Sequence, residues 1–177
     1  MNLYDILMKD NVVEVINNRL EYLKGIIPEI TFMFGFDQKH PHHSMDVWEH
    51  TLYALNLSEK DFEVRLTLLL HDIGKPFSYV DDNAIRHFPG HAEVSAEMTK
   101  KILQRLGYDE NFVGRICYLV KMHDTPITSD DIAKDYEMTY KRFLAQRCDA
   151  LAHNPKYLEG RKMYIAKIKK LLTPAGN

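Results

Sequence analysis

Cysteine is scarce in this chain, because only Cys117 and Cys148 occur among its 177 residues. The two form no CxxC pair and no metal-ligand spacing, which argues against a disulfide framework and against a thiolate zinc site. Long apolar runs are missing as well: runs such as 68–70 fall far short of the roughly 20 residues that cross a bilayer. The start of the chain carries Asp5 and Asp10 and does not resemble a signal peptide. We therefore expect a soluble, cytoplasmic protein that has no contact with a membrane.

The chain also lacks an excess of charge of one sign. Its 23 basic and 25 acidic residues give a net charge of -2. This argues against binding nucleic acid through a broad basic surface, although a local basic groove stays compatible with the sequence. The length, with 45% hydrophobic and 27% charged residues, favours one domain with one sizeable core. The one surplus is histidine, which occurs nine times.

The hydrophobic pattern is helical almost throughout, and no segment has a convincing strand pattern. Residues 28–44 and 75–89 interrupt it as structured loops, and long loops in compact domains are often functional. The sequence therefore predicts an all-α bundle in one domain over residues 1–177. The expected helices are 11–25, 45–58, 61–74, 90–106, 110–123, 129–152 and a basic amphipathic helix that ends at 172.

Histidine or aspartate lies on the apolar face of five of these helices. A single histidine in such a place is more often a hydrogen-bonded core residue than a ligand. A buried carboxylate without a partner is costly, however, and five such faces in one bundle favour a divalent cation bound between the helices. Imidazole with carboxylate suits manganese, iron, cobalt, nickel or zinc better than calcium. The residues are His50, His71 with Asp72, His91, His123 and Asp149.

These residues follow one another in the order H…HD…H…H…D, and the HD pair belongs to the segment His-Asp-Ile-Gly-Lys at 71–75. With HFPGH at 87–91 and CDAL at 148–151, this order resembles the HD-domain metal-dependent phosphohydrolases over about residues 40–153. It looks most like the HD portion of bacterial CCA-adding enzymes. The resemblance implies an all-α HD bundle, with an N-terminal and a C-terminal helix packed on its metal-binding core.

The resemblance also implies a set of metal ligands, namely His50, His71, Asp72 and Asp149. His91 and His123 match the extra positions of two-metal members, in which the aspartate of the HD pair bridges the ions. Asp124 stands where some two-metal members carry a second histidine. We therefore expect one or two ions of manganese, iron, nickel, cobalt or zinc, with magnesium as a further alternative.

The activity that the resemblance implies is hydrolysis of a phosphate ester by a metal-activated water. Asp72, Lys75 and His87 are the expected catalytic residues, and Lys75, His87 and Arg86 are the expected phosphate contacts. The substrate would be a phosphorylated small molecule such as a nucleotide, or an RNA end. One alternative is a non-catalytic module that binds a nucleotide or tRNA around a structural metal. A helical scaffold that binds no metal is a third.

Several polar residues also have a plainer interpretation. Lys75, His87 and Arg86 can be ordinary solvated loop residues, and His153 reads as a helix cap. His40, His42 and His43 fit a polar surface loop better than a cavity entrance. The basic run at 161–170 predicts a packed last helix more than an RNA contact. About 40 residues precede the HD-like region and no Asp-x-Asp occurs, so we expect a free-standing domain that does not add nucleotides.

Overall fold

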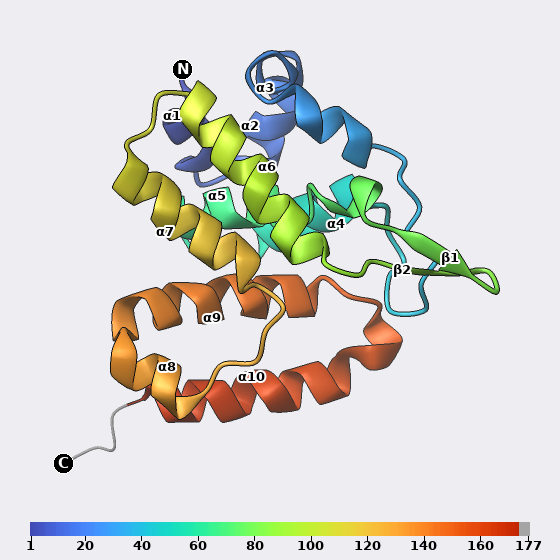
Figure 1. The fold of residues 1–177 in the computed structure, drawn as a ribbon, viewed down its shortest axis with the longest axis vertical. Coiled ribbons are helices and arrows are strands. Elements are labelled where there is room, and N and C mark those ends of the chain that lie inside the picture. The colour runs from blue at the N-terminus through green and yellow to red at the C-terminus, as the bar shows by residue number, and fades with distance from the viewer. Residues whose placement is uncertain (174–177) are drawn as a thin grey trace.

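The computed structural model describes residues 1–173, and helices make up most of them (Figure 1). The predicted helical class is confirmed. The α-helices are α1 Leu3–Leu7, α2 Val12–Asn18, α3 Leu20–Ile26, α4 Val47–Asn56, α5 Phe62–Leu70, α6 His91–Arg105, α7 Glu110–Lys121, α8 Ser129–Lys134, α9 Tyr136–Leu151 and α10 Leu158–Leu172. Short 3-10 helices cover η1 Pro28–Met33, η2 Lys75–Phe77 and η3 Pro155–Tyr157.

Helix α5 is the central element of the fold. Every residue from 64 to 70 is buried, and the helix packs against α1, α4, α7 and α9. Its N-terminus is capped by Asp61, whose side chain accepts a hydrogen bond from the Val64 N–H at 3.0 Å. Because the helix is enclosed on all sides, the residues that follow its C-terminal end at Leu70 lie inside the molecule.

Two helix pairs flank this centre. Helices α6 and α7 pack along each other on one side, and α9 and α10 do so on the other (Figure 1). Gly107, with φ of 81°, ends α6 in the left-handed conformation that the predicted glycine stop requires. Helix α10 lies on the outer side of α9 and is held by buried Ile168 and Leu172. Met163 on the same helix is 73% exposed.

Several helices are shorter than predicted, among them α5, which ends at Leu70 and not at residue 74, and two of the expected helices are broken. The expected helix over 11–25 breaks at Arg19 into α2 and α3, and α1 precedes them. The expected helix over 129–152 breaks at Asp135, which has extended backbone angles and caps α9 by accepting a hydrogen bond from the Met138 N–H. Thr128 caps α8. An aspartate inside a helical pattern competes for backbone donors, and here it starts a new helix.

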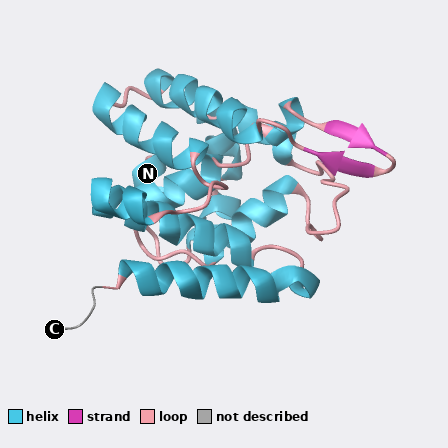
Figure 2. Ribbon diagram, turned by 60° about the horizontal axis from the view of Figure 1, so that its bottom comes forward, coloured by secondary structure: helices cyan, strands magenta, loops and turns pink. Residues whose placement is uncertain are grey.

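A small antiparallel hairpin occupies part of the loop expected at 75–89, so the prediction of no sheet was wrong there. Strand β1 Val80–Asp82 pairs with β2 Ile85–His87, and the ribbon extends away from the helices (Figure 2). Its turn residues Asn83 and Ala84 have φ of 46° and 70°, as type I′ hairpin turns require. Three-residue strands that are mostly exposed show no alternation of apolar and polar residues, so the sequence pattern could not indicate them. Within residues 1–173, no helix combines the length and apolar character needed to cross a bilayer.

Gly74 allows the chain after α5 to approach α6 closely. Its N–H donates to the Ser95 Oγ at 2.9 Å. A Cβ at this position would lie 2.6 Å from the Ser95 backbone nitrogen and 2.8 Å from the His91 carbonyl oxygen. The close approach therefore holds the start of α6 against the end of α5.

We predict that Gly74→Ala lowers the free energy of unfolding by about 1–3 kcal/mol, because backbone atoms must move apart to admit the methyl group. Chemical denaturation measures the effect. Gly114→Ala is the matched control, since its Cβ meets nothing within 4 Å in α7. That change should raise stability by roughly 0.5–1 kcal/mol through helix propensity. Equal stability of Gly74→Ala and wild type would contradict the prediction.

Candidate metal centre

The predicted ligands come together because each lies at or near the end of a helix, and these helix ends meet around Asp72. His71 and Asp72 directly follow α5, and His91 is the first residue of α6. Of the remaining three, His50 lies on α4, His123 lies just after α7 and Asp149 lies near the end of α9. Segments up to 99 positions apart in the chain thus contribute to one cluster.

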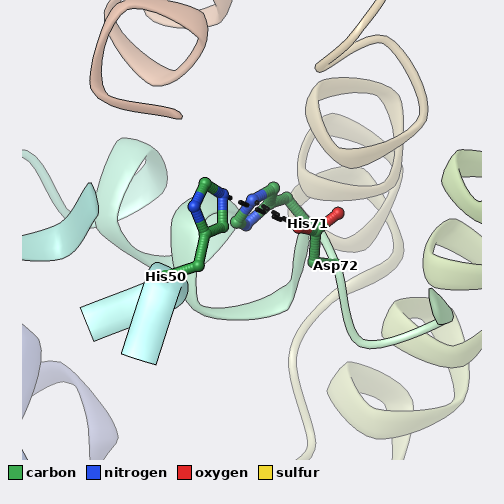
Figure 3. A group of neighbouring side chains, drawn as sticks. All are labelled: His50, His71 and Asp72. Atoms are coloured by element: carbon green, nitrogen blue, oxygen red, sulfur yellow. Dashed lines mark ion pairs between the residues drawn. The ribbon is translucent and has the colours of Figure 1, made fainter. Parts of the chain in front are cut away.

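The first group surrounds one oxygen of Asp72. The Asp72 Oδ2 lies 3.2 Å from the His71 Nε2 and 3.8 Å from the His50 Nε2 (Figure 3). Asp149 completes the group, with its Oδ1 at 2.8 Å from the His50 Nε2 and 3.7 Å from the His71 Nε2. Ligands bound at about 2.0–2.2 Å to one ion stand roughly 3–3.6 Å apart, so these spacings suit a single cation.

The second group surrounds the other oxygen of the same carboxylate. The Asp72 Oδ1 lies 3.5 Å from the His91 Nε2 and 3.7 Å from the His123 Nε2. The two imidazole nitrogens are 3.3 Å apart. Asp124 lies at the edge, with its Oδ2 3.9 Å from the His91 Nε2. Asp72 therefore stands between two sets of candidate ligands.

Backbone carbonyls orient the four histidines of the two groups. The Nδ1 of His71, His91 and His123 lies 2.7–2.9 Å from the carbonyl oxygen three residues earlier in the chain. The His50 Nδ1 lies 3.3 Å from the Ala152 carbonyl oxygen. Because a carbonyl oxygen only accepts, each Nδ1 carries the proton, and in a neutral ring the lone pair stays on the Nε2 that faces Asp72. Metal-binding histidines in proteins use this arrangement.

Unsatisfied polar atoms are the clearest sign that the groups are suited to a cation. The side chains of His71 and Asp72 are each 1% exposed. Within residues 1–173, the His71 Nε2 and both Asp72 carboxylate oxygens make no well-directed hydrogen bond, and the Lys75 ammonium group is an ion-pair partner of the Asp72 Oδ2 alone. Buried polar atoms are hydrogen-bonded in the great majority of cases, so three such atoms in one cluster need an explanation. Imidazole and carboxylate are donor types that divalent transition metals accept, and an ion would satisfy all three.

The protonation states show how the cluster balances its charge. Burial alone would raise the pKa of Asp72 and Asp149, but neighbouring cationic groups hold both pKa values well below the usual range. Burial alone would lower the pKa of His71, yet the two carboxylates raise it to about 10. His123 behaves oppositely, because burial and the His71 charge lower its pKa to about 4. The buried Asp72 and the partly buried Asp149 thus depend on their neighbours to stay ionised.

Four members of the two groups, Asp72, His91, His123 and Asp149, line a cavity of about 490 Å³. Lys75 is buried in its wall and is not a solvated loop residue. Its Nζ lies 2.7 Å from the Asp72 Oδ2, donates to the Gln38 Oε1 at 2.8 Å and sits 5.2 Å from the Phe88 ring centre. His87 lies at the rim. The structure thus brings Lys75 and His87 to the cavity that the metal groups face.

Arg86 does not join them. Its guanidinium is buried, pairs with both oxygens of Asp81 at 2.6 and 2.9 Å, and donates to the Asp37 carbonyl oxygen at 2.8 Å. It also stacks on the rings of Phe36 and Tyr79. Neither expected role, a phosphate contact or a solvated side chain, matches this geometry. Arg86 fastens the hairpin to the loop that precedes α4.

Two histidines that we assigned to ordinary roles face the cluster. The His153 Nδ1 is 2.8 Å from the Asp149 carbonyl oxygen, as expected of a cap, but also 3.8 Å from the Asp149 Oδ1. His50, Asp149 and His153 thereby form a third close set of ligand atoms. His43 lines the cavity with its ring against His50 and His153, and burial lowers its pKa to about 2. Neither lies on a helical face with apolar spacing, so the periodicity could not reveal them.

A buried clamp holds the loop that carries His123. Arg142 is fully buried and donates to the carbonyl oxygens of residues 122, 125 and 126. Gln146 donates to two of the same carbonyls, at 3.1 Å for Met122 and 2.6 Å for Thr125. The Tyr164 hydroxyl donates to the Gln146 Oε1 and accepts from the Ile127 N–H. The second ligand group therefore depends on α9 and α10 as well as on its own helices.

We predict two bound ions per chain, since the Asp72 oxygens face separate groups. Asp72→Asn should remove both ions, His91→Ala should remove one, and His42→Ala should remove none, because His42 stacks on Tyr157 outside the groups. Metal analysis after loading with manganese and gel filtration measures the stoichiometry. Unchanged stoichiometry in His91→Ala would show that its group holds no ion.

The clamp generates a second prediction. Gln146→Met should weaken binding of one ion by about 10–100-fold and spare the other, because changes behind the ligands have effects of this size. Titration against a chelator of known affinity measures the affinity of the protein for each of the two ions. Gln104→Met is the control, since Gln104 is an exposed glutamine that bonds Glu110. Equal weakening of both ions, or of neither, would argue against the clamp.

Comparison with known proteins agrees with this geometry. The chain is 33% identical over 140 residues to the CC-adding tRNA nucleotidyltransferase of Thermus thermophilus, which is 75% of this chain and 31% of that protein. It is 38% identical over 112 residues to the A-adding tRNA nucleotidyltransferase of Deinococcus radiodurans, covering 59% and 26%. A multifunctional CCA protein of Halorhodospira halophila matches over 88 residues at 33% identity, covering 48% and 21%. The chain thus spans about a third or less of these relatives.

The HD domain model matches residues 42–167, which include all the ligand candidates and the clamp. Members of this family are typically phosphohydrolases, and the buried histidine and aspartate cluster is typical of an HD metal site. With the fold, the cluster and this match in agreement, the chain belongs to the HD domain family.

Proposed function

We propose that this protein is a metal-dependent phosphohydrolase that cleaves a phosphate ester of a nucleotide or of an RNA end. The observation that carries the proposal is the placement of Asp72. Its carboxylate is buried and lines the cavity, and its two oxygens face separate histidine groups. A structural site has no need of a bridging carboxylate beneath a cavity, whereas two-metal hydrolysis does.

The candidate ligands divide between two ions. His50, His71, Asp72 and Asp149 would hold the first, and Asp72 with His91 and His123 would hold the second. Such ions, when bound, lower the pKa of a coordinated water to about 7 and stabilise the charge that develops on phosphate oxygens. Manganese, iron, nickel, cobalt and zinc suit the donor set, with magnesium as an alternative.

The chain itself contributes charge and proton transfer. Lys75 is held between Gln38 and Phe88, so its ammonium group stays fixed at the cavity wall. A fixed positive charge there favours the extra negative charge of a phosphoryl transition state. His87 is exposed at the rim, with its ring centre 6.0 Å from that of His40. An imidazole in this place can donate a proton to the departing oxygen.

Two observations favour a nucleotide or RNA substrate. The cavity of about 490 Å³ falls within the size range of small-ligand sites. Two of the relatives named above are tRNA nucleotidyltransferases by their names. We extend that substrate class to the present chain as part of the proposal.

The test is phosphate release from a panel of nucleoside monophosphates, 2′,3′-cyclic nucleotides, dinucleoside polyphosphates and an aryl phosphate. Each is assayed with manganese, nickel, cobalt or magnesium. We expect metal-dependent turnover that falls by at least about 100-fold in Asp72→Asn, because both ligand groups lose their shared oxygen donor. Lys75→Gln should lower kcat more than it raises KM, since its charge acts in the transition state.

Asp82→Asn is the matched control, because Asp82 is exposed on the hairpin away from the cavity lining. It should retain full activity. Absence of turnover from folded, metal-loaded protein on every substrate would overturn the enzyme proposal. Nucleotide or tRNA binding by that same protein would then favour the binding module.

A further inference from the structure

Helix α10 supplies the outer wall of the cavity. Gly160, Arg161 and Tyr164 from this helix line the same space as Asp72 and Asp149. The Tyr164 hydroxyl bonds described above tie this wall to the loop after α7. Helix α10 therefore belongs to the site, and its side chains are placed to meet whatever occupies the cavity.

Arg161 is distinguished by an unpaired guanidinium. The side chain is partly buried, yet within residues 1–173 no hydrogen bond or ion pair involves its guanidinium. The other arginines that are at least partly buried all bond to a carboxylate, a carbonyl or a hydroxyl oxygen. They are Arg65, Arg86, Arg115, Arg142 and Arg147.

Partial burial without a partner has an energetic consequence. Burial lowers the pKa of Arg161, and the charge of Asp149 opposes this only in part. A charged group that loses water without gaining a partner destabilises the protein, and an incoming anion would offset that loss. Guanidinium suits phosphate in particular, because its parallel N–H groups match two phosphate oxygens.

The charges around the cavity are unevenly distributed. Its carboxylates, Asp72, Asp124 and Asp149, belong to or adjoin the two ligand groups. The rest of the lining near Arg161 carries histidines and no further carboxylate. Arg161, His40 and His153 line the same cavity. A ligand that reaches from Lys75, beside the metal groups, to this wall would meet a cationic side chain at each end.

We propose that Arg161 forms a second anion subsite, so that the preferred substrate is a nucleotide carrying a second phosphate besides the one that is cleaved. The inference rests on the proposed function for the role of the first phosphate. The second phosphate is either a free phosphoryl group on a small nucleotide or the next phosphodiester of an RNA end. Arg161 is a specificity residue, because it holds the phosphate that does not react.

The experiment compares adenosine 5′-monophosphate, adenosine 3′,5′-bisphosphate and the 5′-phosphorylated dinucleotide pApA. Calorimetry in EDTA measures the Kd of each ligand for the metal-free protein. In manganese, the KM is measured for ligands that are turned over and the Kd for those that are not. We expect wild type to favour a two-phosphate ligand by about tenfold or more, the effect of one charge-assisted contact. Arg161→Gln should remove that preference and change affinity for the monophosphate by less than about twofold. Preference for pApA over the bisphosphate identifies an RNA end.

Lys162→Gln is the matched control, since Lys162 is exposed on the same helix and pairs with Glu159. It removes the same charge and should keep the preference. Arg161→Lys keeps the positive charge but not the bidentate geometry of guanidinium, so it should retain only part of the preference. This variant controls for a folding defect in Arg161→Gln. No preference in wild type under either condition, or a preference that survives in Arg161→Gln, would overturn the inference. A preference that depends on Arg161 in a protein without turnover would support the subsite and reject the hydrolase.

Discussion

The buried carboxylate of Asp72 is the constraint on which the rest of the site depends. An anion with 1% exposure is stable only among positive partners, and the fold supplies Lys75 and the histidine groups around it. Asp72 reaches this depth because it follows α5, the helix at the centre of the packing. The rigid packing of α5 and the chemistry of the centre therefore have a common origin. Gly74, just beyond the HD pair, allows α6 to bring His91 to the same carboxylate.

Helical periodicity indicates most of this centre. His50 and His91 belong to α4 and α6, and His71 and His123 continue the apolar stripes of α5 and α7 just beyond the ends of these helices, which point into the bundle. The order of the motif residues also indicates that these side chains form one metal site, because it matches the HD pattern over nearly two-thirds of the chain. The end of α6 was also predictable, since Gly107 takes up the left-handed conformation that stops the helix there.

Other parts of the site depend on contacts that no local pattern encodes. Arg142 and Gln146 act on carbonyl groups about twenty positions away, and a carbonyl carries no sequence signal. Arg86 is buried because its partner Asp81 lies across a hairpin whose short exposed strands resemble a loop. Such features are set by tertiary structure, which overrides local preference.

The hydrogen bonds from ring Nδ1 to backbone carbonyl show that two properties of the centre have different origins. Local sequence sets the orientation of the histidine rings, and long-range packing sets the distances between them. In His71, His91 and His123 the acceptor lies three residues earlier in the chain, so each ring carries its tautomer and direction within a single turn. Spacing between rings, by contrast, depends on how distant helices pack. Substitutions in the core would thus change the distances between correctly oriented donors and not their orientation. Drift of this kind alters which ion fits best, so the same ligands can acquire a new metal preference through changes far from the metal.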